Sequence, residues 1–139
     1  MRYLRFVVLL TLGVFCAAPA LPQEKTEPKL EMSTYQVALL KRGAKWTPEE
    51  TAEVLRIQRE HMANIRKMAD GGKLLLAGPF TDGGELRGMF VFKVGSAEEA
   101  KALCEQDPAV RAGRLVCELH PWLSAKGISV PHSAGSKKQ

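Results

Sequence analysis

The order of the helical and extended patterns is what most constrains the fold of this chain. Apolar residues recur first with the spacing of a strand, then of a helix, two strands, a second helix and a last strand. The six segments are residues 35–40, 47–69, 73–80, 86–94, 96–106 and 114–120. This βαββαβ order predicts an α+β, ferredoxin-like fold, with one antiparallel sheet and both helices on one face. A chain of 139 residues has room for one such domain.

Both expected helices begin with a capping signal. Residues 47–50 read Thr-Pro-Glu-Glu, and residues 96–99 read Ser-Ala-Glu-Glu, so each pattern places a hydroxyl three residues before a glutamate. The first helix should stop at Gly71, where glycine can adopt the conformation that ends a helix. The second should end near Gln106, because Asp107 precedes a proline.

The sheet is expected to have one face that no helix covers. In the third strand, Met89 and Val91 lie on one side, and Phe90 and Phe92 lie on the other. Both helices are used on the first face, so Phe90, Phe92 or their neighbours would remain uncovered. An apolar face of this kind predicts a homodimer that pairs two copies of the sheet.

The N-terminus has the pattern of a secretion signal. Arg2 and Arg5 precede the apolar run 6–15, and Ala-Pro-Ala follows at 18–20. A membrane anchor would need a run about twice as long, of roughly twenty residues. A lipid-modified Cys16 is the other alternative, but a bulky phenylalanine precedes that cysteine. We therefore expect cleavage, and a mature protein that is periplasmic or secreted.

These features divide the chain into four parts. We expect a signal peptide at 1–20, a flexible linker at 21–33, the α+β domain at 34–124 and a disordered tail at 125–139. Cleavage removes two of the 20 basic residues and none of the 15 acidic ones, so the formal net charge falls from +5 to +3. So small a charge, without an aromatic-basic cluster, gives no case for nucleic acid. Nor do we expect membrane association after cleavage.

Two cysteines remain in the expected mature chain, Cys104 and Cys117. Cys104 lies on the apolar face of the second helix, and Cys117 shares one face of the last strand with Leu115 and Leu119. If the helices cover that face, the two thiols approach across the core. An exported protein can then hold either a disulfide or two buried thiols, and the sequence leaves both alternatives open.

Several short motifs together resemble one known family. They are His61, the stretch Lys-Leu-Leu-Leu-Ala-Gly-Pro at 73–79, Gly88, the stretch Asp-Pro-Ala-Val-Arg-Ala-Gly at 107–113, and His-Pro-Trp at 120–122. In this combination residues 34–123 resemble the YCII (YciI-like) family of small dimeric α+β-barrel proteins. The resemblance implies a dimer that pairs two sheets, and a cleft holding a histidine and an aspartate. The residues that match these two are His61 and Asp107.

Two functions follow from these residues. If the fold brings His61 and Asp107 together, the carboxylate can orient the imidazole for acid/base catalysis. Such a pair suits a lyase, isomerase or dehydrohalogenase-like reaction on a small cyclic or carbonyl-bearing molecule, with Gly78, Pro79 and Phe90 as candidate substrate-binding residues. Alternatively, His61 only packs in the core and Asp107 only caps a helix. The chain would then be a non-catalytic dimeric ligand-binding or envelope-stress module.

We expect neither a metal nor another cofactor. The chain has three scattered histidines and no His-x-His or Cys-x-x-Cys spacing. Its Gly-rich stretch at 82–84 fits a hairpin turn better than a phosphate-binding loop. The remaining expected partner is a small-molecule ligand.

Overall fold

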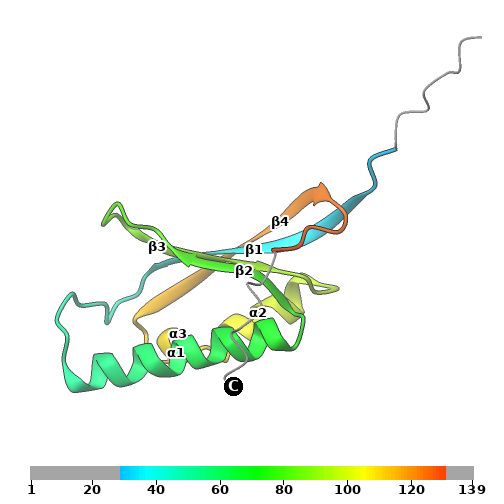
Figure 1. Cartoon of the computed structure of the whole chain (residues 1–139). Helices are drawn as coiled ribbons and strands as arrows, with labels where there is room; N and C mark the ends of the chain where they lie inside the picture. The colour runs from blue at the N-terminus through cyan, green and yellow to red at the C-terminus, as the bar shows by residue number, and fades with distance from the viewer. Residues whose placement is uncertain (1–28, 131–139) are drawn as a thin grey trace, which may run out of the picture.

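The computed structural model describes residues 29–130, which form one antiparallel sheet and three helices (Figure 1). The strands lie in the order β2-β3-β1-β4. The elements are β1 (Met32–Arg42), α1 (Ala52–Asp70), β2 (Leu74–Pro79), β3 (Leu86–Phe92), α2 (Ala97–Glu105), α3 (Pro108–Arg111) and β4 (Leu115–Ala125). This arrangement confirms the expected ferredoxin-like α+β class.

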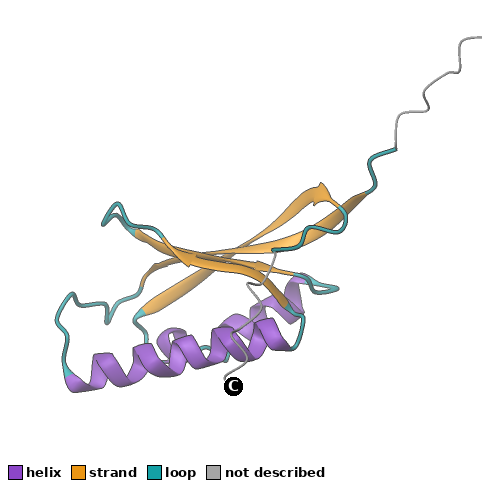
Figure 2. Cartoon of the chain, viewed as in Figure 1, coloured by secondary structure: helices purple, strands orange, loops and turns teal. Residues whose placement is uncertain are grey.

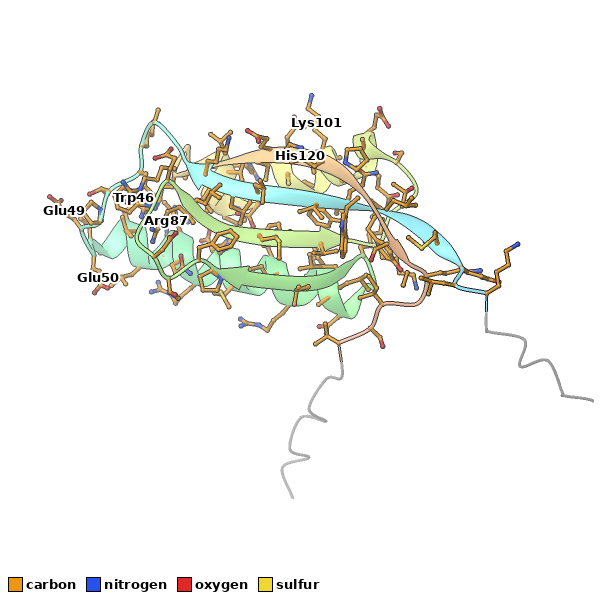
Figure 3. The ribbon with its side chains drawn as sticks, turned by 90° about the horizontal axis from the view of Figure 1, so that it is seen from above. Trp46, Glu49, Glu50, Arg87, Lys101 and His120 are labelled. Carbon is orange, nitrogen blue, oxygen red and sulfur yellow. The ribbon has the colours of Figure 1, made fainter. Side chains whose placement is uncertain are left out.

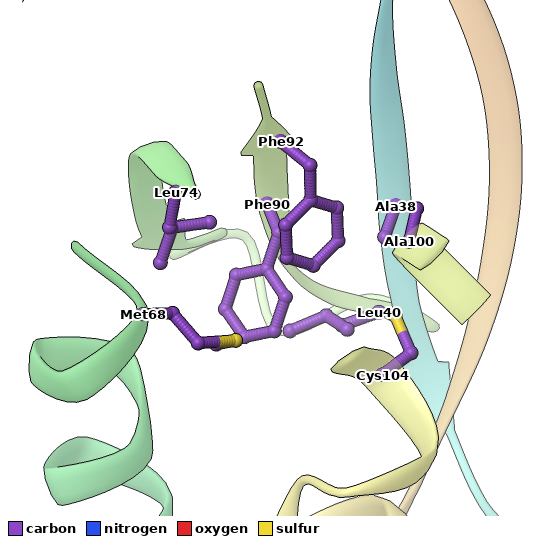
Figure 4. Packing of buried hydrophobic residues seen from close by; sticks show 8 residues of the cluster. All are labelled: Ala38, Leu40, Met68, Leu74, Phe90, Phe92, Ala100 and Cys104. Atoms are coloured by element: carbon purple, nitrogen blue, oxygen red, sulfur yellow. The ribbon is translucent and has the colours of Figure 1, made fainter. Parts of the chain in front are cut away.

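The three helices lie on the same side of the sheet, and the hydrophobic core lies between the two layers (Figure 2). Phe90 and Phe92 form the centre of this core, with ring centroids 5.6 Å apart in an edge-on contact (Figure 4). The buried residues around them are Ala38, Leu40, Met68, Leu74, Ala100 and Cys104. Helices and sheet therefore stabilise one another through a single apolar layer.

The strand register decides which residues remain on the open sheet face. Phe90 pairs with Ala38 and Phe92 pairs with Gln36, and both phenylalanines point toward the helices. The sequence predicted that Phe90, Phe92 or their neighbours would lie on the uncovered face. For Phe90 and Phe92 themselves this prediction is wrong. Their neighbours Met89 and Val91 lie on that face, because successive side chains of a strand point to opposite sides.

The first helix begins later than its sequence pattern indicates. Thr51 is the N-cap of α1, and its hydroxyl accepts a hydrogen bond from the Val54 N–H at 3.2 Å. The Thr47 hydroxyl instead accepts from the Glu49 N–H in a local turn. The expected start at Thr47 is therefore wrong, because a second threonine four residues on provides the cap. The second helix does begin at Ala97, capped by Ser96.

The last strand is longer than expected. It was predicted to end before Pro121, yet β4 continues to Ala125, with Pro121 opposite Gln36 of β1. Since β4 is at the edge of the sheet, it pairs on one side only, and a proline without an N–H is tolerated there. The short helix α3, which starts directly after Asp107, was not predicted either.

The ends of the expected domain also differ. β1 begins at Met32, inside the predicted linker. Beyond β4, Lys126 N–H donates to the Glu31 carbonyl and Gly127 N–H donates to the Tyr35 hydroxyl, so the start of the predicted tail is attached to the domain. The predicted signal peptide and residues 131–139 lie outside the described residues. Within 29–130, no helix is long and apolar enough to cross a membrane.

Candidate functional site

The structure brings His61 and Asp107 into direct contact. His61 lies on the buried face of α1 with Ile57 and Met68, and Asp107 is the N-cap of α3, which packs against α1. The Nδ1 atom of His61 is 2.8 Å from Oδ1 and 2.9 Å from Oδ2 of Asp107. The two residues are far apart in sequence, so the contact depends on the packing of α1 on α3.

Asp107 is fully buried and has other hydrogen-bond partners besides His61. Its Oδ1 accepts from the Ala109 N–H at 2.9 Å, and its Oδ2 accepts from the Asn64 amide at 3.0 Å. Burial alone raises the pKa of Asp107, but the hydrogen bond and charge of His61, followed by the bonds from Asn64 and Ala109, outweigh it. The net effect lowers the pKa of Asp107 below its ordinary value.

An ionised Asp107 determines which nitrogen of His61 carries the proton. A carboxylate can only accept, so Nδ1 must be the donor in the bond between them. In the neutral imidazole, the lone pair then resides on Nε2, at the opposite edge of the ring. The His61 ring stacks on Phe90, with centroids 5.9 Å apart and planes at 24°, which fixes its orientation.

His61 also borders a cleft of about 670 Å³, which Asp107 does not line. α1 contributes Met62 and Ile65 to this cleft, and the end of β2 contributes Gly78 and Pro79. A volume of this size is ordinary for small-molecule sites. A buried imidazole that is oriented by a carboxylate and faces such a cleft has the arrangement of a general acid or base.

The candidate catalytic and substrate-binding residues from the sequence lie together in this one place. His61, Gly78, Pro79 and Phe90 line the cleft, and Asp107 lies behind His61. Gly88 lines the cleft as well. A Cβ at this position would lie 2.8 Å from the Gly78 carbonyl oxygen, so only glycine lets β3 approach β2 this closely. The chemical roles of these residues remain predictions.

Some residues of the site were missed by the sequence analysis. Asn64, which donates to Asp107 behind His61, could have been found, since it lies three positions after His61 on the same face of α1. Arg42, Arg87 and Arg114 could not, because strand ends and loops far apart in sequence bring them to the cleft.

The two cysteines are free thiols in the structure. Cys104 belongs to the core, and Cys117 packs against it from the helix-covered face of β4. A hydrogen bond with Cys104, and then burial, raises the pKa of the Cys117 thiol far above its ordinary value. A thiol with so high a pKa is protonated and a poor nucleophile at neutral pH. The disulfide remains a prediction.

The described residues, 29–130, contain no group of three or more His, Cys, Asp or Glu side chains placed to bind a metal. His120 lies on the other face of the sheet, where its Nε2 is 3.0 Å from Glu118. Trp122 is on that face as well, so neither residue belongs to the cleft.

The fold, with its buried His–Asp pair beside a cleft, defines a small α+β domain with one candidate site. The family model of the YCII-related domain matches residues 37–122, more than half of the chain, and the protein therefore belongs to this family. No curated protein is similar enough to this chain to count as a match.

One solved structure with a similar fold is the 5-chloro-2-hydroxyhydroquinone dehydrochlorinase TftG from Burkholderia phenoliruptrix AC1100, in complex with 2,5-dihydroxybenzoquinone. The two sequences are 15% identical, and the match covers 65% of this chain and 93% of that one, with a TM-score of 0.48. So distant a likeness carries no argument about the chemistry of this chain.

The lowered pKa of Asp107 predicts a pH-dependent contribution to stability. A carboxyl whose pKa is lower in the folded than in the unfolded protein stabilises the fold above about pH 4, and this contribution is lost as the pH falls through the folded value. Asp107→Asn should therefore lower the free energy of unfolding at pH 7, by on the order of 1–3 kcal/mol. The difference from the unchanged protein should shrink toward pH 2, as measured by urea denaturation.

The matched control is Asp70→Asn, at the exposed end of α1. This variant should stay within about 0.5 kcal/mol of the unchanged protein at every pH. Parallel stability curves for Asp107→Asn and the unchanged protein between pH 7 and pH 2 would contradict the role given to the carboxylate.

Proposed function

We propose that this chain is a small-molecule enzyme in which His61 transfers a proton and Asp107 orients and stabilises His61. The observation that carries the proposal is the geometry of the pair: Nδ1 of a buried imidazole contacts a buried carboxylate, and the ring borders a cleft. Asp107 is a positioning residue, because it contacts His61 and does not line the cleft.

The reaction class follows from what the cleft contains. Among the described residues that line it there is no serine or cysteine, so the observed lining favours proton transfer over a covalent intermediate on such a side chain. His61 Nε2 would take a proton from a carbon next to a carbonyl, and the electron pair of the C–H bond would remain on the substrate as an enolate. Asp107 would stabilise the resulting imidazolium.

The enolate can then continue in two ways. In an isomerase, the imidazolium returns its proton to a different atom of the same substrate. In a lyase or dehydrohalogenase, the electron pair forms a C=C bond, a leaving group such as halide departs with the electrons of its own bond, and His61 releases the proton to water. Both outcomes need only one acid/base group and no redox partner.

The same contacts also support a second candidate, a non-catalytic ligand-binding or envelope-stress module. Asp107 caps α3 and binds Asn64 of α1, so the pair also holds two helices together. In that case the cleft binds its ligand without turning it over, and His61 serves the fold.

We further propose that two copies of the chain pair through their open sheet faces, as a dimeric α+β barrel. This face carries Val37, Leu39 and Met89 around an apolar groove of about 410 Å³, which the buried Val91 and, after β4, Ile128 and Val130 also line. Trp122 beside them is 43% exposed. A second copy is the partner because the patch repeats identically on it, and a two-fold axis brings like surfaces together.

Export is the remaining part of the proposal. The basic, apolar and small-residue segments within residues 1–20 support a cleaved signal and a periplasmic or secreted protein. When the full chain is expressed in cells that export it, the intact mass of the purified protein should correspond to a chain that begins at Leu21. A mass that includes residues 1–20 would contradict cleavage.

His61→Gln tests the enzymatic proposal. The assay is incorporation of solvent deuterium, followed by proton NMR, into a panel of cyclic ketones, lactones and chlorinated hydroquinones. The unchanged protein should accelerate exchange or elimination for at least one compound, and His61→Gln should reduce that rate by about 10²-fold or more. His120→Gln, an exposed histidine on the other sheet face, should leave the rate unchanged.

Thermal unfolding of the same variants separates the two candidate functions. If His61→Gln is still folded at the assay temperature and has lost the turnover of the unchanged protein, the histidine is catalytic. If it loses stability and no compound of the panel reacts with the unchanged protein, His61 serves the fold and the chain is a binding module.

Leu39→Glu tests the dimer. Sedimentation equilibrium should give twice the chain mass for the unchanged protein and a single chain mass for Leu39→Glu, because a carboxylate would be buried in the apolar interface. Arg66→Glu, on the exposed face of α1, should remain a dimer. A monomeric unchanged protein would contradict the pairing.

A further inference from the structure

Three arginines border the same cleft as His61. Arg42 comes from the end of β1, Arg87 from β3, and Arg114 from the residue before β4, and all three are half-buried. The only acidic side chain among the described residues that line the cleft is Glu50, which is exposed. We call Arg42, Arg87 and Arg114 the arginine set. It gives the cleft an excess of positive charge that the weak net charge of the chain does not predict.

No carboxylate of residues 29–130 forms an ion pair with the arginine set. Backbone carbonyls orient the three side chains instead. Arg42 Nη2 donates to Gly83 at 2.8 Å, and Arg114 Nη2 donates to Thr47 at 3.0 Å. Arg87 Nη1 makes a longer contact with Gly84, at 3.4 Å. Carbonyls fix a guanidinium without neutralising its charge, and each arginine has five N–H donors, so further donors remain for a ligand.

Trp46 fixes two of the guanidinium groups further. The Arg42 guanidinium carbon lies 4.1 Å from the centroid of the Trp46 ring, and that of Arg87 lies 5.4 Å away. Figure 3 shows Trp46 and Arg87 at the same end of the molecule. The Nε atom of Arg42 is buried and has no hydrogen-bond partner in the described part of the chain. A buried donor without a partner is costly, and a ligand oxygen would relieve that cost only if the Arg42 side chain shifted to expose Nε.

We propose that the cleft takes a small cyclic carboxylate as its ligand, with the carboxylate bound by the arginine set. A planar guanidinium matches the two oxygens of a carboxylate with two parallel hydrogen bonds. The apolar part of the cleft, which includes Leu55, Met62 and Phe90, accommodates the ring of the ligand. The ring then lies between the arginine set and His61.

The part of this inference that concerns the reaction rests on the proposed function, because the bound ring presents a reacting carbon to His61 only if His61 is catalytic. The arginine set would hold the end of the substrate that does not react. Its contribution to binding, however, can be measured without any turnover, so the two proposals can fail separately.

The probes are two carboxylates and their neutral amides: benzoate with benzamide, and cyclohexanecarboxylate with cyclohexanecarboxamide. The reporter is the fluorescence of Trp46 in a Trp122→Phe protein, in which Trp46 is the only tryptophan left. At least one carboxylate should give a saturable change in fluorescence and bind at least about tenfold more tightly than its amide. Equal affinity for acid and amide, or no binding of either acid, would overturn the proposal.

Variants assign the binding to the arginine set. Arg42→Gln, Arg87→Gln and Arg114→Gln should each weaken carboxylate binding by about tenfold and leave amide binding unchanged. Arg59→Gln, an exposed arginine on α1, should have no effect. Because Arg42 packs on Trp46, Arg42→Lys is the second variant, and its retained charge should recover part of the lost affinity. Unchanged carboxylate binding in all three glutamine variants would overturn the assignment.

The His61→Gln protein keeps the two proposals distinguishable. It should bind the carboxylate as tightly as the unchanged protein, because His61 does not contact the carboxylate. Carboxylate binding without turnover of any compound would contradict only the enzymatic proposal. Turnover of neutral compounds at rates that the arginine variants do not change would contradict only the carboxylate site.

Discussion

The contact between His61 and Asp107 is the interaction on which the helical layer and the site both depend. A carboxylate that is removed from water is costly unless donors surround it, and Asp107 is fully buried. His61 and Asn64 of α1, together with the N–H of Ala109, provide those donors. The same bonds that compensate the buried charge join α1 to α3 and orient the imidazole. Stability and chemistry are therefore coupled at this position.

Successive side chains of β3 point to opposite faces of the sheet. The cleft lies on one of these faces, and the proposed dimer surface lies on the other. Phe90 points to the helices, stacks on the His61 ring and lines the cleft. Val91, the next residue, points to the open face, where the proposed second copy would pack. Because the two surfaces are on opposite sides of one sheet, changes on one side should affect the other only through the sheet itself. The arginine set lies on the cleft side, where loops and strand ends meet.

Much of the fold could be predicted from the sequence because its signals are local. The Ser96–Glu99 pattern placed the start of α2 correctly, and the βαββαβ order gave the sheet. The start of α1 was missed because Thr47 and Thr51 can both cap, and only the hydrogen bond to Val54 distinguishes them. The length of β4 was missed since the tolerance of Pro121 depends on its place at the sheet edge, which is a tertiary property.

The site could be predicted only in part. His61 and Asp107 came from a family resemblance, and the structure brings them together by packing α1 on α3. The arginine set had no signal, because a single arginine in a strand or loop indicates nothing until the fold places three of them around one cleft. The choice between Phe90 and Val91 for the covered face likewise depended on strand register.

The most direct test of the central claim is the protonation state of the His61 ring nitrogens, measured by nitrogen-15 NMR of the imidazole at a pH where the ring is neutral. His61→Gln assigns the signals, and a histidine in a short unfolded peptide is the reference. The account predicts one dominant tautomer for His61, with the proton on Nδ1 toward Asp107 and the lone pair on Nε2 toward the cleft. A proton on Nε2, or a mixture of tautomers like that of an exposed histidine, would contradict it.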